Sequence, residues 1–73
     1  MANNKAQAEF YGQLRKHQPV LHLRKLSYDD CCIVLCRWRN EWVTWVETTS
    51  GNYIVGHYFQ DYDKALADYK ART

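Results

Sequence analysis

The stretch that decides the fold is Cys36-Arg37-Trp38-Arg39-Asn40-Glu41-Trp42-Val43-Thr44-Trp45, which carries three tryptophans within eight residues. Tryptophan has the largest side chain, and a chain of 73 residues has little interior in which to bury it. The stretch therefore either builds most of the core or presents a face to a partner.

Strands are predicted on both sides of this stretch and within it. Three segments are rich in β-branched and aromatic residues, as strands are: residues 31–39, 42–49 and 52–59. The dipeptides Asn40-Glu41 and Ser50-Gly51 separate them at the spacing of two-residue hairpin turns. Gly51 supplies the positive φ that a tight turn needs. We therefore expect an antiparallel meander.

Two-residue turns would fix the pairing of these strands. Trp38 is then opposite Val43, while Trp45 is opposite both Cys36 and Gly56. Gly56 leaves room for the indole of Trp45, a common role of glycine within a strand. The face that carries Trp38 and Trp45 is almost purely apolar, and we expect it to be the core. Its residues are Cys32, Val34, Cys36, Trp38, Val43, Trp45, Ile54 and Tyr58.

Two further elements are predicted before the meander. Residues 3–17 form a helix in this interpretation, because Ala6, Phe10 and Leu14 recur at a spacing of four. Residues 20–26 are ambiguous. Their leucines alternate with polar residues, which favours a short strand, but a second helical segment is the alternative.

A C-terminal helix is predicted for residues 62–72, with Asp61 as its N-cap. The expected fold is a single α+β domain over residues 1–73. It has an N-terminal helix, a three- or four-stranded antiparallel meander, and a C-terminal helix that covers one sheet face. The N-terminal helix would pack on the sheet edge or on the second face.

Composition limits the functional classes. The chain is 47% apolar and 15% aromatic, which is typical of a globular protein. Its formal charge of +2 is too small to indicate a nucleic-acid partner by itself. The three cysteines are an odd number on one stretch, which favours reduced thiols in the cytoplasm. Neither a secretion signal nor a membrane span is predicted.

The second sheet face, which we call the outer face, is the predicted binding site. One end of it is basic and aromatic, and the candidate binding residues there are Arg37, Arg39, Trp42, His57 and Phe59. Arginine beside tryptophan is enriched at protein interfaces, so a protein partner is expected, with homodimerisation through this face as the simplest version. The alternative is nucleic-acid binding, because the same side chains can stack on single-stranded bases. A purely structural role, with arginine stems packed over the rings, is also open.

Enzymatic and metal chemistry are not predicted. Cys31, Cys32 and Cys36 lie along one strand, whereas zinc ligands usually lie in turns with a second pair elsewhere. The carboxylate pairs are explained by capping and turns, and no glycine-rich phosphate loop is present. We expect no cofactor and no metal.

Two resemblances add expectations. The order helix, three antiparallel strands, helix resembles the double-stranded RNA-binding domain in topology. The RNA-contacting motifs of that family are not matched, because the last helix here opens with the acidic run Asp61-Tyr62-Asp63. A tail of about 17 residues resembles the tails of small uncharacterised proteins from bacteria, their phages and mobile elements. This tail reads Gly56-His57-Tyr58-Phe59-x-Asp61-x-x-x-Ala65-x-x-Asp68-Tyr69-x-x-Arg72. It implies a cytoplasmic accessory protein that binds, and in some cases inhibits, another protein.

Overall fold

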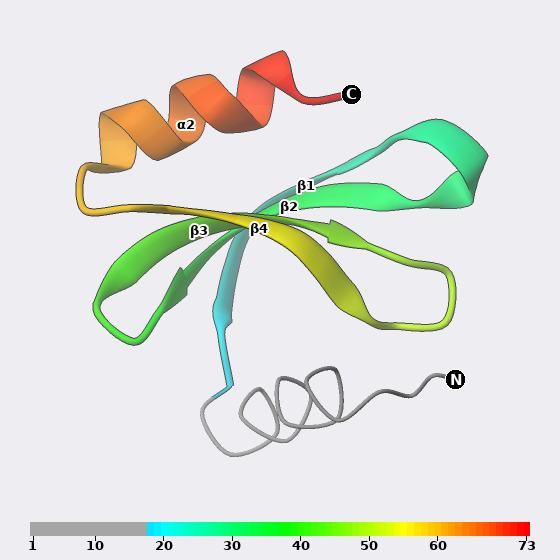
Figure 1. Cartoon of the computed structure of the whole chain (residues 1–73), viewed down its shortest axis with the longest axis horizontal. Helices are drawn as coiled ribbons and strands as arrows, with labels where there is room; N and C mark the ends of the chain where they lie inside the picture. Colours follow the sequence, from blue (N-terminus) through cyan, green and yellow to red (C-terminus); the bar gives the residue numbers. More distant parts are fainter. Residues whose placement is uncertain (1–17) are drawn as a thin grey trace.

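The computed structural model describes residues 18–73 and shows an antiparallel sheet covered on one face by a helix. The helix predicted for residues 3–17 lies outside the described residues. The elements are β1 (Val20–Leu26), the short 3-10 turn η1 (Tyr28–Asp30), β2 (Cys32–Trp38), β3 (Glu41–Glu47), β4 (Tyr53–Phe59) and α2 (Tyr62–Ala71). The strands follow one another in the order β1-β2-β3-β4, and α2 lies across the sheet (Figure 1). The predicted α+β class with an antiparallel sheet is confirmed.

Residues 20–26 are a strand, which settles the alternative that the sequence left open. β1 pairs with β2 from Val20 opposite Arg37 to Leu26 opposite Cys32. The register shifts between Leu21 and Leu23, so His22 forms a bulge. The sheet therefore has four strands, with β1 at one edge and β4 at the other.

The turn between β2 and β3 lies one residue earlier than predicted. Arg39 and Asn40 occupy it with φ of 53° and 65°, the pair of positive values that a type I′ turn requires. Glu41 therefore does not need a positive φ, and it is the first residue of β3. Cys36 is opposite Val43 and Trp45 is opposite Val34, so the predicted partners were wrong by two residues. A shift of two leaves the paired side chains of β2 and β3 on their predicted faces, but Arg39, which was predicted for the outer face, is now a turn residue.

The connection between β3 and β4 also differs from the prediction. It is a three-residue loop, residues 49–51, in which the Gly51 amide donates to the Thr48 carbonyl at 2.9 Å. Gly51 has the positive φ that was expected, 88°. The extra loop residue shifts the register by one, and a bulge at Val55 reverses the shift further along. Tyr53 therefore packs beside Trp45, and Ile54 lies on the other face, the reverse of the prediction.

The two sheet faces carry separate buried clusters. The predicted core face is buried at its centre, at Val34, Cys36, Trp38, Val43 and Trp45. Ile54 and Tyr58, which were predicted for this face, are exposed. A Cβ atom on Gly56 would lie 2.7 Å from Trp45 Nε1, which confirms that this glycine makes room for the indole.

The second cluster lies beneath α2, on the face that the sequence interpretation left for a partner. Ala65 and Tyr69 of α2 are buried there against Ile33 and Leu35 of β2. We call this side the helix face and the other the tryptophan face. The connection from Phe59 to the N-cap Asp61 is short, and Phe59 itself packs in this cluster, which directs the chain onto the helix face. The middle of the predicted binding face is therefore covered by α2.

Candidate functional site

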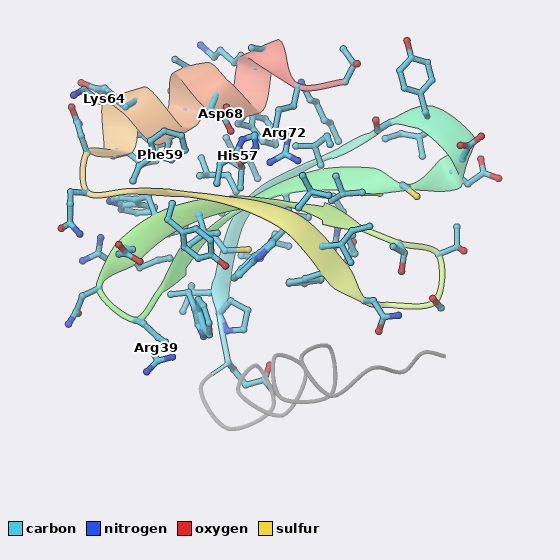
Figure 2. All side chains as sticks on the ribbon, in the orientation of Figure 1. Arg39, His57, Phe59, Lys64, Asp68 and Arg72 are labelled. Atoms are coloured by element: carbon cyan, nitrogen blue, oxygen red, sulfur yellow. The ribbon has the colours of Figure 1, made fainter. Side chains whose placement is uncertain are left out.

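A polar network joins α2 to the middle of the sheet. The hydroxyl of Thr44, which is fully buried on β3, donates to Asp68 Oδ2 over 2.6 Å. His57 Nδ1 on β4 lies 3.0 Å from the same oxygen. Figure 2 shows His57, Asp68 and Arg72 close together between the helix and the strands. Three elements thus meet at one carboxylate.

Arg72, just after α2, completes this network. Its Nη1 donates to the hydroxyl of Thr44 over 2.9 Å and to the Thr44 carbonyl over 3.2 Å. Its Nη2 donates to the carbonyl of Val55 over 2.9 Å. A planar guanidinium can hold such a fork of acceptors at once. Arg72 therefore fixes the end of α2 to β3 and to the bulge of β4.

The network keeps Asp68 ionised. Burial alone would raise the pKa of this carboxyl, but hydrogen bonds from Thr44 and His57 and the charges of His57 and Arg72 outweigh it, and the pKa is lowered. A carboxylate that orients a histidine can serve a general base. Here, however, the same carboxylate also accepts from the buried Thr44 hydroxyl, and Arg72 bonds that threonine and the Val55 carbonyl. The arrangement therefore best explains the attachment of α2.

A second group of side chains gathers around Trp42, where β1, β2, β3 and α2 meet. The guanidinium of Arg37 lies 4.9 Å from the ring centroid of Trp42. The rings of His22 and Tyr62 approach Trp42 edge-on, at centroid distances of 4.8 and 4.7 Å. We call these four residues the Trp42 corner. Trp42 is half-buried within it.

The structure distributes the five predicted binding residues over three places. Arg37 and Trp42 lie together in the Trp42 corner, and Phe59 is opposite Trp42 in the register. His57 is engaged by Asp68. Arg39 lies over Trp38, on the tryptophan face, at 5.4 Å. In Figure 2 the label of Arg39 is accordingly far from those of His57 and Phe59. The five residues do not form one continuous patch.

Among residues 18–73, the largest group of exposed aliphatic side chains lies on β1, which the sequence interpretation did not select. Val20 is 59% exposed, Leu21 43% and Leu26 72%, and Leu23 is exposed as well. We call these four residues the β1 edge. Within residues 18–73 no strand pairs with the outer side of β1. A signal was present in the sequence, because the first strand of a meander must lie at an edge and this one is apolar on both faces.

Within residues 18–73 no group of three histidine, cysteine or acidic side chains could hold a metal ion. Burial raises the pKa of the Cys36 thiol to about 12, which suits a small apolar core residue. Cys31 and Cys32 are half-buried thiols. No helix in the described part of the chain is long and apolar enough to cross a membrane.

Comparisons of the chain with protein-family models, with curated proteins and with solved structures give no match. The two resemblances drawn from the sequence therefore stay predictions, and function has to be argued from the geometry.

Proposed function

We propose that this protein is a small, non-enzymatic binding module that contacts another protein chain through the β1 edge and the adjoining Trp42 corner. The observation that supports this most is the exposure of four large aliphatic side chains on one edge strand. An edge strand offers unpaired backbone donors and acceptors to an added strand. Apolar side chains along it supply affinity for such an addition.

The Trp42 corner adds the side-chain types that dominate binding energy at interfaces, tryptophan, tyrosine and arginine. Arg37 already lies against Trp42, and Tyr62 supports the ring from α2. This packing restricts the rotamers before a partner arrives, which lowers the entropic cost of binding. The proposed surface includes Arg37 and Trp42, which the sequence analysis selected, together with the β1 edge, which it did not. The half-buried thiols suit a reducing compartment such as the cytoplasm.

Nucleic-acid binding by the arginines and aromatic residues stays the alternative prediction. A base needs an open ring face on which to stack. Arg37 already occupies one face of Trp42. The geometry therefore favours the protein-binding hypothesis.

A pair of positions of nearly equal exposure allows a direct test. Leu21 on β1 is 43% exposed and Ile54 on β4, the opposite edge, is 41% exposed. A photo-crosslinking amino acid is introduced at one or the other position in cells that make the protein, and the adducts are identified by mass spectrometry. We expect discrete protein adducts from position 21 that position 54 does not give.

Each adduct partner is then purified, and its Kd is measured with wild type and with Leu21→Lys. We expect the substitution to weaken the complex at least tenfold, as removal of a central interface residue does. The same adducts from both positions, or an unchanged Kd, would contradict the proposed function.

A further inference from the structure

The two edges of the sheet differ in their ability to accept another strand. On β4 the backbone is broken by the bulge at Val55, whose φ is 53°, and its carbonyl is already bonded by Arg72. Bulges and blocked carbonyls are common protections of an edge. β1 also carries a bulge, at His22, but all of its residues except Lys25 are exposed, and no strand among residues 18–73 pairs with its outer side. With four exposed aliphatic side chains, β1 is the edge that offers more apolar surface to an added strand within the described residues.

The bulge at His22 gives β1 a self-complementary pattern. Val20, His22, Leu23 and Lys25 lie on the helix face: Val20 is opposite Arg37, His22 contacts Trp42, Leu23 is opposite Leu35, and Lys25 lies over Tyr69. Leu21 and Arg24 lie on the tryptophan face, where Arg24 bonds Glu47. From position 20 to 25 the faces therefore read helix, tryptophan, helix, helix, tryptophan, helix. This order is the same in both directions.

From this pattern we infer that the partner at the β1 edge is a second copy of this chain, paired antiparallel about a two-fold axis between His22 and Leu23. The inference rests on the proposed function of the same surface. Arg24 is then opposite Leu21 of the second copy, and Lys25 is opposite Val20. Both α2 helices lie on one side of a continuous eight-stranded sheet. Moving the register by one residue either way would set side chains of opposite faces against each other.

The charges are compatible with this register. Like charges directly opposite each other would weaken the pairing, and this register has none. Arg24 reaches across β2 to Glu47 of β3 through two bonds, of 2.9 and 3.0 Å, and Lys25 Nζ lies 4.8 Å from the ring centroid of Tyr69 on α2. Both charged ends are thus held over the chain's own sheet, so neither has to be buried unpaired against Leu21 or Val20 of the second copy. An acidic extended peptide, the other occupant that this edge could take, would gain nothing from the symmetric pattern.

Opposite charges placed at Val20 test the pairing, with dimer Kd measured by sedimentation equilibrium. We expect Val20→Lys to weaken the dimer, because it faces Lys25 of the second copy, and Val20→Glu to strengthen it. Each change is roughly 2- to 30-fold, since every dimer holds two such pairs. The double variant Val20→Lys with Lys25→Glu should recover the affinity. Ile54→Lys and Ile54→Glu, on the other edge, should leave Kd unchanged, and circular dichroism confirms that all variants are folded.

Three results would overturn the inference. Wild type could stay monomeric up to about 1 mM, both Val20 variants could shift Kd in the same direction, or the Ile54 variants could shift it as much. Failure of the dimer is distinguishable from failure of the proposed function. If only the dimer fails, the crosslinker at position 21 captures a different protein. If the proposed function fails, it captures no more than the crosslinker at position 54.

Discussion

Val55 adopts a backbone conformation in which a β-branched side chain clashes with the chain itself. Its φ of 53° lies in the left-handed region, which costs roughly 1–2 kcal/mol for an L-residue. The bulge needs this conformation to restore the register that the three-residue loop displaced, and Arg72 bonds the Val55 carbonyl there. The strained residue is thus part of the bulge that interrupts β4.

Replacing Val55 with glycine should therefore stabilise the protein. Glycine adopts positive φ without a clash, and Val55 is 60% exposed, so little packing is lost. We expect the free energy of unfolding, measured with urea, to rise by about 1 kcal/mol. Ile54→Gly, one residue earlier with ordinary strand geometry, should lower it by about 1 kcal/mol. Equal losses in both variants would show that Val55 carries no strain.

Gly56→Ala should have the opposite effect. The added Cβ would lie 2.7 Å from Trp45 Nε1 and 2.9 Å from Tyr58 Oη, both closer than van der Waals contact. We expect a loss of about 1–3 kcal/mol, typical of overpacking, together with a changed near-ultraviolet circular dichroism signal from the indole. An unchanged stability would mean that Trp45 does not pack on Gly56.

The attachment of α2 depends on a carboxylate as well as on its apolar residues. Ala65 and Tyr69 are buried and Leu66 packs beside them, while Asp68 bonds Thr44 and His57, and Arg72 bonds Thr44 and Val55. Asp61 caps the other end by accepting from the Asp63 amide over 3.0 Å, as the sequence predicted. The choice of sheet face could not be predicted, because it depends on Thr44 meeting a residue far along the chain.

The lowered pKa of Asp68 gives a pH dependence with a definite sign. In the unfolded chain this carboxyl titrates near 3.8, and in the folded chain below it. Its contribution to stability is therefore fully present above about pH 5 and is lost as the pH falls through 3.8 and lower. We expect Asp68→Asn to cost about 1–3 kcal/mol at pH 7 and to lose less stability than wild type on acidification. If the free energy of unfolding fell equally in both proteins from pH 7 to pH 3, this prediction would be contradicted.

Across the molecule, the sequence predicts which elements form better than how they meet. The tryptophan and glycine spacing predicts the core face, and Asp61 predicts the start of α2. The exact partners fail, because a turn at Arg39-Asn40 and one at Asn40-Glu41 differ by a single residue. That Arg37 and Trp42 share a face follows from strand alternation, although the predicted turn pairs Trp42 with Arg39 instead. The bond from His57 to Asp68 could not be predicted, since nothing local in the sequence places α2 over β4.

The different edges predict where assembly stops. With β4 interrupted by its bulge at Val55, a β1 contact joins two chains and leaves only this interrupted edge among the described strands. Such an interface is isologous, and its symmetry is closed. We expect the molar mass measured by light scattering to approach twice the chain mass at high concentration and to rise no further. A mass that keeps rising would show that a second surface takes part.

The central claim is the pairing of β1 with β1, and an isotope-filtered nuclear Overhauser experiment tests it most directly. An equimolar mixture of labelled and unlabelled chain reports only contacts between copies. The account predicts backbone contacts from Leu21 to Arg24 and from Val20 to Lys25 of the other copy. Contacts that involve β4 instead, or none at concentrations where the dimer is populated, would contradict it.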